Sequence, residues 1–210
     1  MKKIISLVTT IVIVAGLSVP SLAISEEKML ENRLYEMQDV ILTVDDDSDV
    51  KIHVLTEEEA IEYYQKSYGM TREEAARQVA LLRYDGYQQV EFKVEKDFGA
   101  GYTVEAGALV KCYAQGSFFS FEEVIDKWTK ETSTGDYSFD EAYIQATISS
   151  NKQKLTVQAR GVCEVALQVS QQDTVGVELL GAGFSHGSVT GTTVYYRKID
   201  TWAKSWTRTA

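Results

Sequence analysis

The chain has few of the residues on which most catalytic sites depend. Its 210 residues include two histidines, His53 and His186, and two cysteines. It has no His-Glu-x-x-His motif and no phosphate-binding glycine loop, so no such motif supports zinc-dependent or phosphoryl-transfer chemistry. His186 lies in a glycine-rich stretch that we interpret as a loop. We expect no catalytic residue, no metal site and no cofactor.

Basic residues are also scarce, with 21 Lys and Arg against 31 Asp and Glu and a formal charge of −10 at pH 7. Nucleic-acid binding needs clustered Lys and Arg to contact phosphates, so we expect no nucleic-acid partner. Carboxylates are plentiful, but the adjacent pairs Glu122–Glu123 and Asp140–Glu141 point to opposite faces if they lie on strands. A glycoside hydrolase would have to assemble its two carboxylates across strands, and it ranks third among the functions we consider.

The sequence has no apolar run long enough to span a membrane. The longest, Ile4–Leu17, has 14 residues, whereas a span needs about 20. Lys2 and Lys3 precede this run and the small residues Ser21 and Ala23 follow it, which is the pattern of an export signal cleaved after Ala23. A retained anchor helix is the alternative. We therefore expect a secreted, extracellular protein with a charge of −12 once residues 1–23 are removed.

Export makes the two cysteines, Cys112 and Cys163, a candidate disulfide. Cys112 falls on the apolar face of an alternating stretch over residues 101–114, and Cys163 falls on the apolar face of residues 155–169. Both thiols are thus expected to point into the core, as an inter-sheet or cross-strand bridge requires. Two separate buried thiols are the alternative.

Residues 155–169 carry the most regular strand pattern in the chain. A strand with a period of two places their odd positions on one apolar face. Residues 142–148 also alternate, and the turn-forming residues 149–153 join the two stretches, so the sequence predicts a β-hairpin. Gly161 predicts a bulge or bend. The apolar face comprises Leu155, Val157, Ala159, Gly161, Cys163, Val165, Leu167 and Val169.

Similar patterns recur at short intervals over residues 88–200, which predicts an α+β chain dominated by an antiparallel β-sandwich or barrel. We expect residues 87–210 to form this disulfide-linked sandwich domain. Residues 118–128 fit either a strand or a helix begun by Ser120. The other predicted strands cover residues 90–94, 102–114, 175–179 and 189–199.

Residues 24–86, before the sandwich, are predicted to be helical. The spacings Thr56–Glu59 and Thr71–Glu74 are both capping boxes, so a helical hairpin is expected over residues 57–83. This hairpin either packs on a sheet or serves as a small attachment module. It carries three tyrosines that we interpret as packing residues, with a ligand platform as the alternative: Tyr63, Tyr64 and Tyr68.

Two further elements are predicted before the hairpin. The first is a short helix over residues 25–38. The second is a small β-hairpin of residues 40–44 and 50–55 around the acidic turn Asp45–Asp49. A calcium loop beginning at Asp45 would need glycine in place of Val50 and a bidentate Glu in place of Thr56, so we interpret the turn as solvated.

Aromatic and basic residues cluster near the C-terminus and form the candidate binding surface. Rings beside cations suit a glycan, a membrane surface or an extracellular protein, and ordinary strand packing is the alternative. We expect a secreted, non-enzymatic module that binds a cell surface, glycan or host protein. The alternative is a membrane-active, pore-forming-like protein that inserts residues 175–196. The cluster comprises Tyr195, Tyr196, Arg197, Lys198, Trp202 and Trp206.

Overall fold

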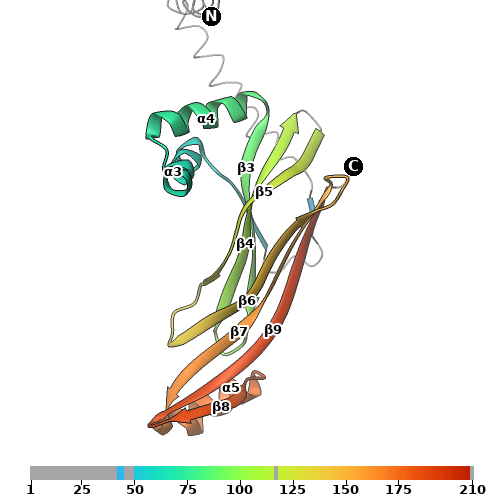
Figure 1. Cartoon of the computed structure of the whole chain (residues 1–210). Helices are drawn as coiled ribbons and strands as arrows, with labels where there is room; N and C mark the ends of the chain where they lie inside the picture. Colours follow the sequence, from blue (N-terminus) through green and yellow to red (C-terminus); the bar gives the residue numbers. More distant parts are fainter. Residues whose placement is uncertain (1–41, 45–49, 116–117, 209–210) are drawn as a thin grey trace, which may run out of the picture.

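The computed structural model describes residues 42–44, 50–115 and 118–208 (Figure 1). The predicted signal peptide, the helix over residues 25–38 and the acidic turn at 45–49 lie outside these residues. Within them, helices α3 and α4 precede most of the strands, and a short helical cap follows β7. The bounds are β1 Leu42–Val44, β2 Val50–Val54, α3 Glu57–Tyr68, α4 Arg72–Tyr84, β3 Tyr87–Asp97, β4 Thr103–Gln115, β5 Phe118–Glu131, β6 Tyr137–Ile148, β7 Lys154–Gln168, η1 Val169–Gln171, η2 Gln172–Gly176, α5 Val177–Gly181, β8 Ser185–Thr190 and β9 Thr193–Arg208.

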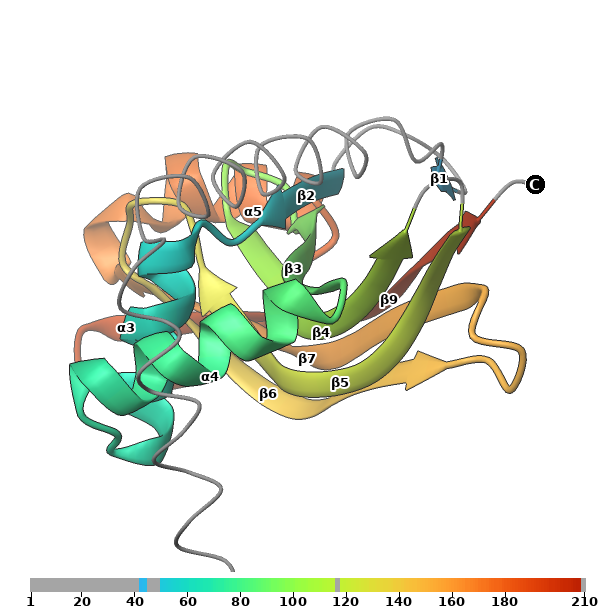
Figure 2. The same cartoon turned by 90° about the horizontal axis from the view of Figure 1, so that it is seen from above.

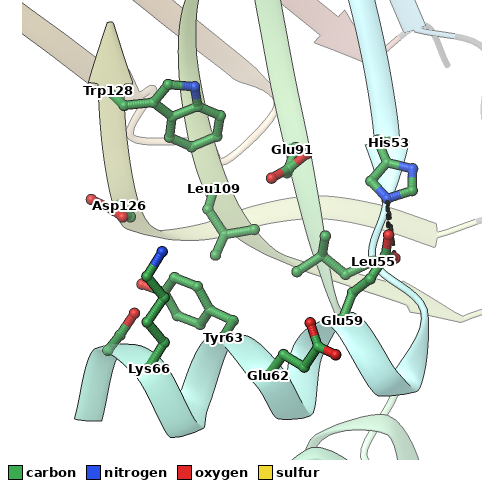
Figure 3. Close-up of a pocket in the computed structure, with 11 residues that line it drawn as sticks. His53, Leu55, Glu59, Glu62, Tyr63, Lys66, Glu91, Leu109, Asp126 and Trp128 are labelled. Atoms are coloured by element: carbon green, nitrogen blue, oxygen red, sulfur yellow. Dashed lines mark hydrogen bonds and ion pairs between the residues drawn. The ribbon is translucent and has the colours of Figure 1, made fainter. Parts of the chain in front are cut away.

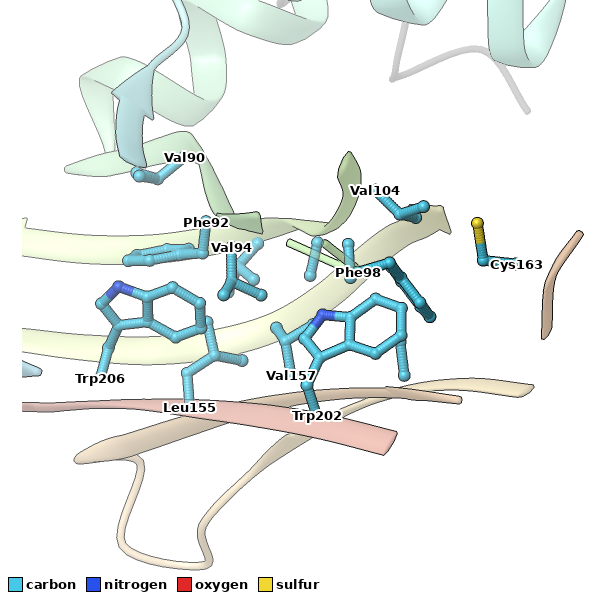
Figure 4. Close-up of a cluster of buried hydrophobic side chains, with 14 of the residues drawn as sticks. Val90, Phe92, Val94, Phe98, Val104, Leu155, Val157, Cys163, Trp202 and Trp206 are labelled. Atoms are coloured by element: carbon cyan, nitrogen blue, oxygen red, sulfur yellow. The ribbon is translucent and has the colours of Figure 1, made fainter. Parts of the chain in front are cut away.

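The strands form two antiparallel sheets packed face to face. Sheet A has the order β1-β9-β7-β6, with β8 also paired to β9, and sheet B has the order β2-β3-β4-β5. Aromatic side chains from both sheets meet between them: Phe92 of β3 lies 5.3 Å from Trp206 of β9, and Phe98 lies 5.8 Å from Trp202, measured between ring centroids (Figure 4). The predicted α+β fold with an antiparallel sandwich is confirmed.

β7 is the central strand of sheet A, and its alternation is as predicted. Its odd positions from Leu155 to Leu167 are buried, and its register with β9 is unbroken. The irregularity expected at Gly161 lies instead in β6, where Ala142 is an extra residue opposite the Gly161 region. A Cβ at position 161 would lie 2.1 Å from Cζ of Phe139, so glycine lets that ring pack against β7.

The predicted disulfide is wrong, because both thiols are free and buried. Cys163 lies beside Tyr102, whose pKa is raised by burial and secondly by the nearby thiol. Tyr102 immediately precedes β4, whereas Cys112 lies nine residues after Thr103, the first residue of that strand. Nine residues of strand span about 30 Å, and a disulfide needs Cα atoms within about 7 Å. Both cysteines point into the core, but far apart: Cys112 lies near the end of β4, and Cys163 of β7 lies near the start of β4.

Two local predictions also fail. β1 and β2 do not form a hairpin, because β1 pairs with β9 and β2 with β3. The strand predicted over residues 175–179 is helical. Val175 and Leu179 face the core with the i,i+4 spacing of a helix, whereas Val177, which a strand would place beside them, is 61% exposed. In contrast, residues 118–128 belong to a strand, β5.

The helical hairpin packs on the outer face of sheet B. Packing on a sheet was one of the two roles predicted for it. Both capping boxes are present, with Thr56 and Thr71 as the N-caps. β4 is buried on both faces between Ala106 and Val110 because its Leu109 side chain points away from the sandwich and joins the helices. That second core comprises Leu55, Ala60, Ile61, Ala75, Val79 and Leu109.

Candidate functional site

A groove runs between α3 and the outer face of sheet B, and we call it the α3 groove (Figure 3). Its volume is about 430 Å³. Leu55, which precedes α3, and Leu109 of β4 lie in the core between the helical hairpin and sheet B, and the groove opens beside them. The lining residues are His53, Leu55, Glu59, Glu62, Tyr63, Lys66, Ser67, Glu91, Leu109, Asp126 and Trp128.

The floor of the groove is apolar and held in place by close packing. Leu55 and Leu109 are buried, and Tyr63 and Trp128 pack against them. The Trp128 indole covers Gly107, where a Cβ would lie 2.4 Å from the ring. Its Nε1–H donates to Glu105 Oε1 at 3.1 Å. The indole is therefore fixed in orientation and presents a defined surface to the groove.

The walls carry four carboxylates from three elements: Glu59 and Glu62 from α3, Glu91 from β3 and Asp126 from β5. Glu91 forms an ion pair with Lys93 at 2.6 Å. Neither Glu62 nor Asp126 forms an ion pair with another described residue. Both side chains are exposed, Glu62 on the α3 side and Asp126 on the β5 side of the groove, which Lys66 of α3 also lines (Figure 3).

Glu59 links the groove to the start of α3. Its carboxylate accepts from the backbone N–H of Thr56 at 2.7 Å, and both of its oxygens lie 3.1 Å from Nε2 of His53 on β2. The pKa of Glu59 lies below its ordinary value, first because of the Thr56 N–H, then the Thr56 hydroxyl and then His53. Glu59 is thus ionised at neutral pH, but its carboxylate is already engaged by Thr56 and His53.

The three hairpin tyrosines divide between packing and the groove. Tyr64 accepts a hydrogen bond from Nε2 of Gln89 on β3 at 3.0 Å and stacks on Tyr68 with ring centroids 5.4 Å apart. Tyr63 lines the groove, and partial burial raises the pKa of its phenol. Tyr63 is therefore a neutral aromatic wall at physiological pH.

The predicted C-terminal cluster does not form one surface. β9 extends to Arg208 and directs Tyr196, Trp202 and Trp206 into the core, where all three are buried. Lys198 Nζ donates to the carbonyls of Phe98 and Ala182 at 2.6 and 2.8 Å. The remaining two residues face outward: Tyr195 is partly buried, and Arg197 is exposed.

The segment Gly183-Phe-Ser-His-Gly187 has the spacing of a hydrolase nucleophile elbow, which requires a sharp strand-to-helix turn. Here Ser185 begins strand β8, and its hydroxyl donates to the Arg197 carbonyl at 3.0 Å. His186 is exposed, and its Nδ1 lies 3.0 Å from the Gly187 carbonyl. Neither the backbone nor the hydrogen bonds give this serine the geometry of a nucleophile.

The covering of the outer face of sheet B could have been predicted from one feature of the sequence. Residues 106–110, Ala-Gly-Ala-Leu-Val, contain no polar residue on either strand face. Such a run indicates that something covers the second face of the strand. No sequence pattern indicates that Trp128 lines the groove, since its position depends on the pairing of Gly107 with Trp128 across β4 and β5.

Comparison of the chain with known protein families, with curated proteins and with solved structures finds no match. Among residues 42–44, 50–115 and 118–208, no group of three or more His, Cys, Asp or Glu side chains is arranged to hold a metal ion. No helix in the same residues is both long enough and apolar enough to cross a membrane. The α3 groove brings charged and aromatic side chains of α3 and sheet B together, and the functional proposal rests on it.

Proposed function

We propose that the protein is an exported, non-enzymatic binding module whose α3 groove takes a basic segment of an extracellular protein. The observation that carries this proposal is the placement of Glu62 and Asp126 on opposite walls above an apolar floor (Figure 3). An arginine or lysine side chain combines an apolar stem with a charged end. Its stem fits the floor, and its charge is matched by the two carboxylates.

The aromatic wall supports the same ligand chemistry. Cations are attracted to the face of an indole ring within about 6 Å of its centroid. Lys93 Nζ, which is paired with Glu91, lies 5.9 Å from the centroid of the Trp128 ring, near the limit of such contacts. A guanidinium group entering the groove would find Trp128 and Tyr63 as flat surfaces and Asp126 as a charged partner.

The charge of the whole chain favours a basic partner. The formal charge of −12 on the mature chain attracts positively charged molecules and speeds their encounter at low ionic strength. A glycan without positive charge would use only the aromatic walls. The pore-forming alternative has less support, because Leu179 and Tyr196, within the segment expected to insert, are buried in the sandwich core.

Tryptophan fluorescence tests the proposal. Trp128 lines the groove, whereas Trp202 and Trp206 are buried between the sheets, so a ligand in the groove changes mainly the emission of Trp128. The mature chain, residues 24–210, is titrated with an arginine-rich peptide and with a peptide in which glutamine replaces arginine. We expect a saturable change with the first peptide alone, weakened by salt and absent in Trp128→Phe. An identical response to both peptides, or none, contradicts the proposal.

A further inference from the structure

β6 forms one edge of sheet A, with β5 of the other sheet beside it (Figure 2). Its first half lies beside β5. There the Phe139 N–H donates to the Glu131 carboxylate at 2.7 Å, and the Thr129 hydroxyl donates to the Glu141 carboxylate. Beyond Glu141, no such bond from another described element reaches the edge.

The hydrogen bonds at the end of the β6–β7 hairpin fix which backbone groups face outward. The Ser149 N–H donates to the Lys154 carbonyl at 2.8 Å. Because hydrogen-bonded pairs alternate along an antiparallel ladder, Tyr143, Gln145 and Thr147 bond to their β7 partners. The N–H and C=O groups that point away from β7 belong to Ile144, Ala146 and Ile148.

The Ala142 bulge interrupts this edge at one end, but residues 143–148 beyond it have none of the usual protection against pairing. Natural edge strands are commonly interrupted by charges, proline or bulges. Residues 142–148, Ala-Tyr-Ile-Gln-Ala-Thr-Ile, have no charged residue, proline or glycine. The other sheet edges in the described part of the chain are short, charged or less regular: β1 has three residues, β2 carries Lys51, β5 carries several acids and lysines, and β8 has a bulge after His186.

We propose that residues 142–148 pair antiparallel with the same residues of a second copy of this chain, joining two copies of sheet A across a two-fold axis at Gln145. The segment is self-complementary in this register: Ile144 faces Ala146, Tyr143 faces Thr147 and Gln145 faces itself. Such an isologous contact closes as a dimer. The ladder uses the outward N–H and C=O groups of Ile144 and Ala146, and Ile148 faces Ala142 of the other copy.

The charge distribution limits where two copies of the chain can meet. Two mature copies with a net charge of −12 each repel one another over most of their surfaces. The repulsion is smallest where an uncharged strand meets an uncharged strand. The core faces also match, because Ile144, Ala146 and Ile148 are partly buried against the sandwich core and would pack against their counterparts.

Light scattering of the mature chain over a concentration series, with two lysine variants, tests this pairing. Gln145→Lys places two like charges directly opposite each other across the axis. Ala203→Lys is the matched control, because Ala203 lies in the same row and on the same face of sheet A, two strands from the edge. Positions 145 and 203 are both exposed, so both variants are compatible with folding. Amide hydrogen exchange of Ile144, Ala146 and Ile148 reports the ladder directly.

We expect the unmodified chain and Ala203→Lys to dimerise with protected amides at these three residues. Gln145→Lys should raise the dimer dissociation constant about tenfold or more and expose the same amides. A chain that remains monomeric at about 1 mM overturns the proposal. A dimer that Gln145→Lys leaves intact also overturns it, since another surface would then hold the dimer, and so does an equal loss in both variants.

Discussion

The indole of Trp128 lies directly over Gly107, at a distance that leaves no room for a side chain at that position. Glycine in the middle of β4 thus sets the shape of the α3 groove floor. Gly107→Ala should push the indole off the sheet and lower the free energy of unfolding by about 1–3 kcal/mol. It should also weaken binding of the arginine-rich peptide. Urea unfolding and fluorescence titration measure the two effects.

Gly181→Ala is the control for this substitution, because a Cβ at position 181 meets no atom within 4 Å. Its free energy of unfolding and its peptide affinity should stay close to those of the unmodified chain. If Gly107→Ala behaves in the same way as Gly181→Ala, the ring is not held by contact with residue 107 and the described floor is wrong.

Much of the fold follows from local patterns in the sequence. The period of two in β7 and the capping boxes at Thr56 and Thr71 are local signals, and the structure has both. Residues 175–179 were open to error because Val175 and Leu179 share a face in a strand and in a helix alike. Helix geometry prevails there: Leu179 packs in the core, whereas Val177 is exposed.

The candidate site was harder to predict because it is assembled from distant parts of the chain. His53, Glu62 and Asp126 come from β2, α3 and β5 and meet only when the helical hairpin packs on sheet B. The interpretation of the C-terminal aromatic residues as one surface was wrong for a local reason. Alternation along one long strand sends Trp202 and Trp206 inward, and its extent was not evident from the residues after Ile199.

The two thiols should be free and unreactive in the folded protein. Cys112 is fully buried, and its pKa is raised well above the ordinary value; burial raises the pKa of Cys163 to about 12. Thiolates are the reactive species, so iodoacetamide should add to neither residue at neutral pH. Mass spectrometry after denaturation without reductant should show two adducts. A denatured, unreduced chain that takes none would show a disulfide and refute the assignment.

The helical hairpin should lose stability in acid. Backbone N–H groups of Thr56 and Thr71 donate to Glu59 and Glu74 and lower the pKa values of both carboxyls below the ordinary 4.5. The stabilisation is therefore present above that pH and is lost as the pH falls through the lowered pKa values. Far-ultraviolet circular dichroism should show helix loss in that range.

Thr71→Ala removes one cap and provides the comparison for the acid experiment. The exchange should cost about 1 kcal/mol of stability at neutral pH. Because the Thr71 hydroxyl also donates to Glu74 and lowers its pKa, its loss should reduce the acid-dependent part. Thr190→Ala, at an exposed position of β8 outside any helix cap, should change neither quantity. Equal pH profiles for Thr71→Ala and the unmodified chain would contradict a role for the capping box.

The carboxylates on the walls of the α3 groove should select a cationic ligand. The most direct measurement is the dissociation constant of the arginine-rich peptide for Glu62→Gln/Asp126→Asn. Its control, Glu73→Gln/Asp173→Asn, removes the same total charge at exposed positions that do not line the groove. We predict about a tenfold or greater rise in the constant for the groove variant and little change for the control. Equal affinities of the two variants for the peptide would contradict the claim.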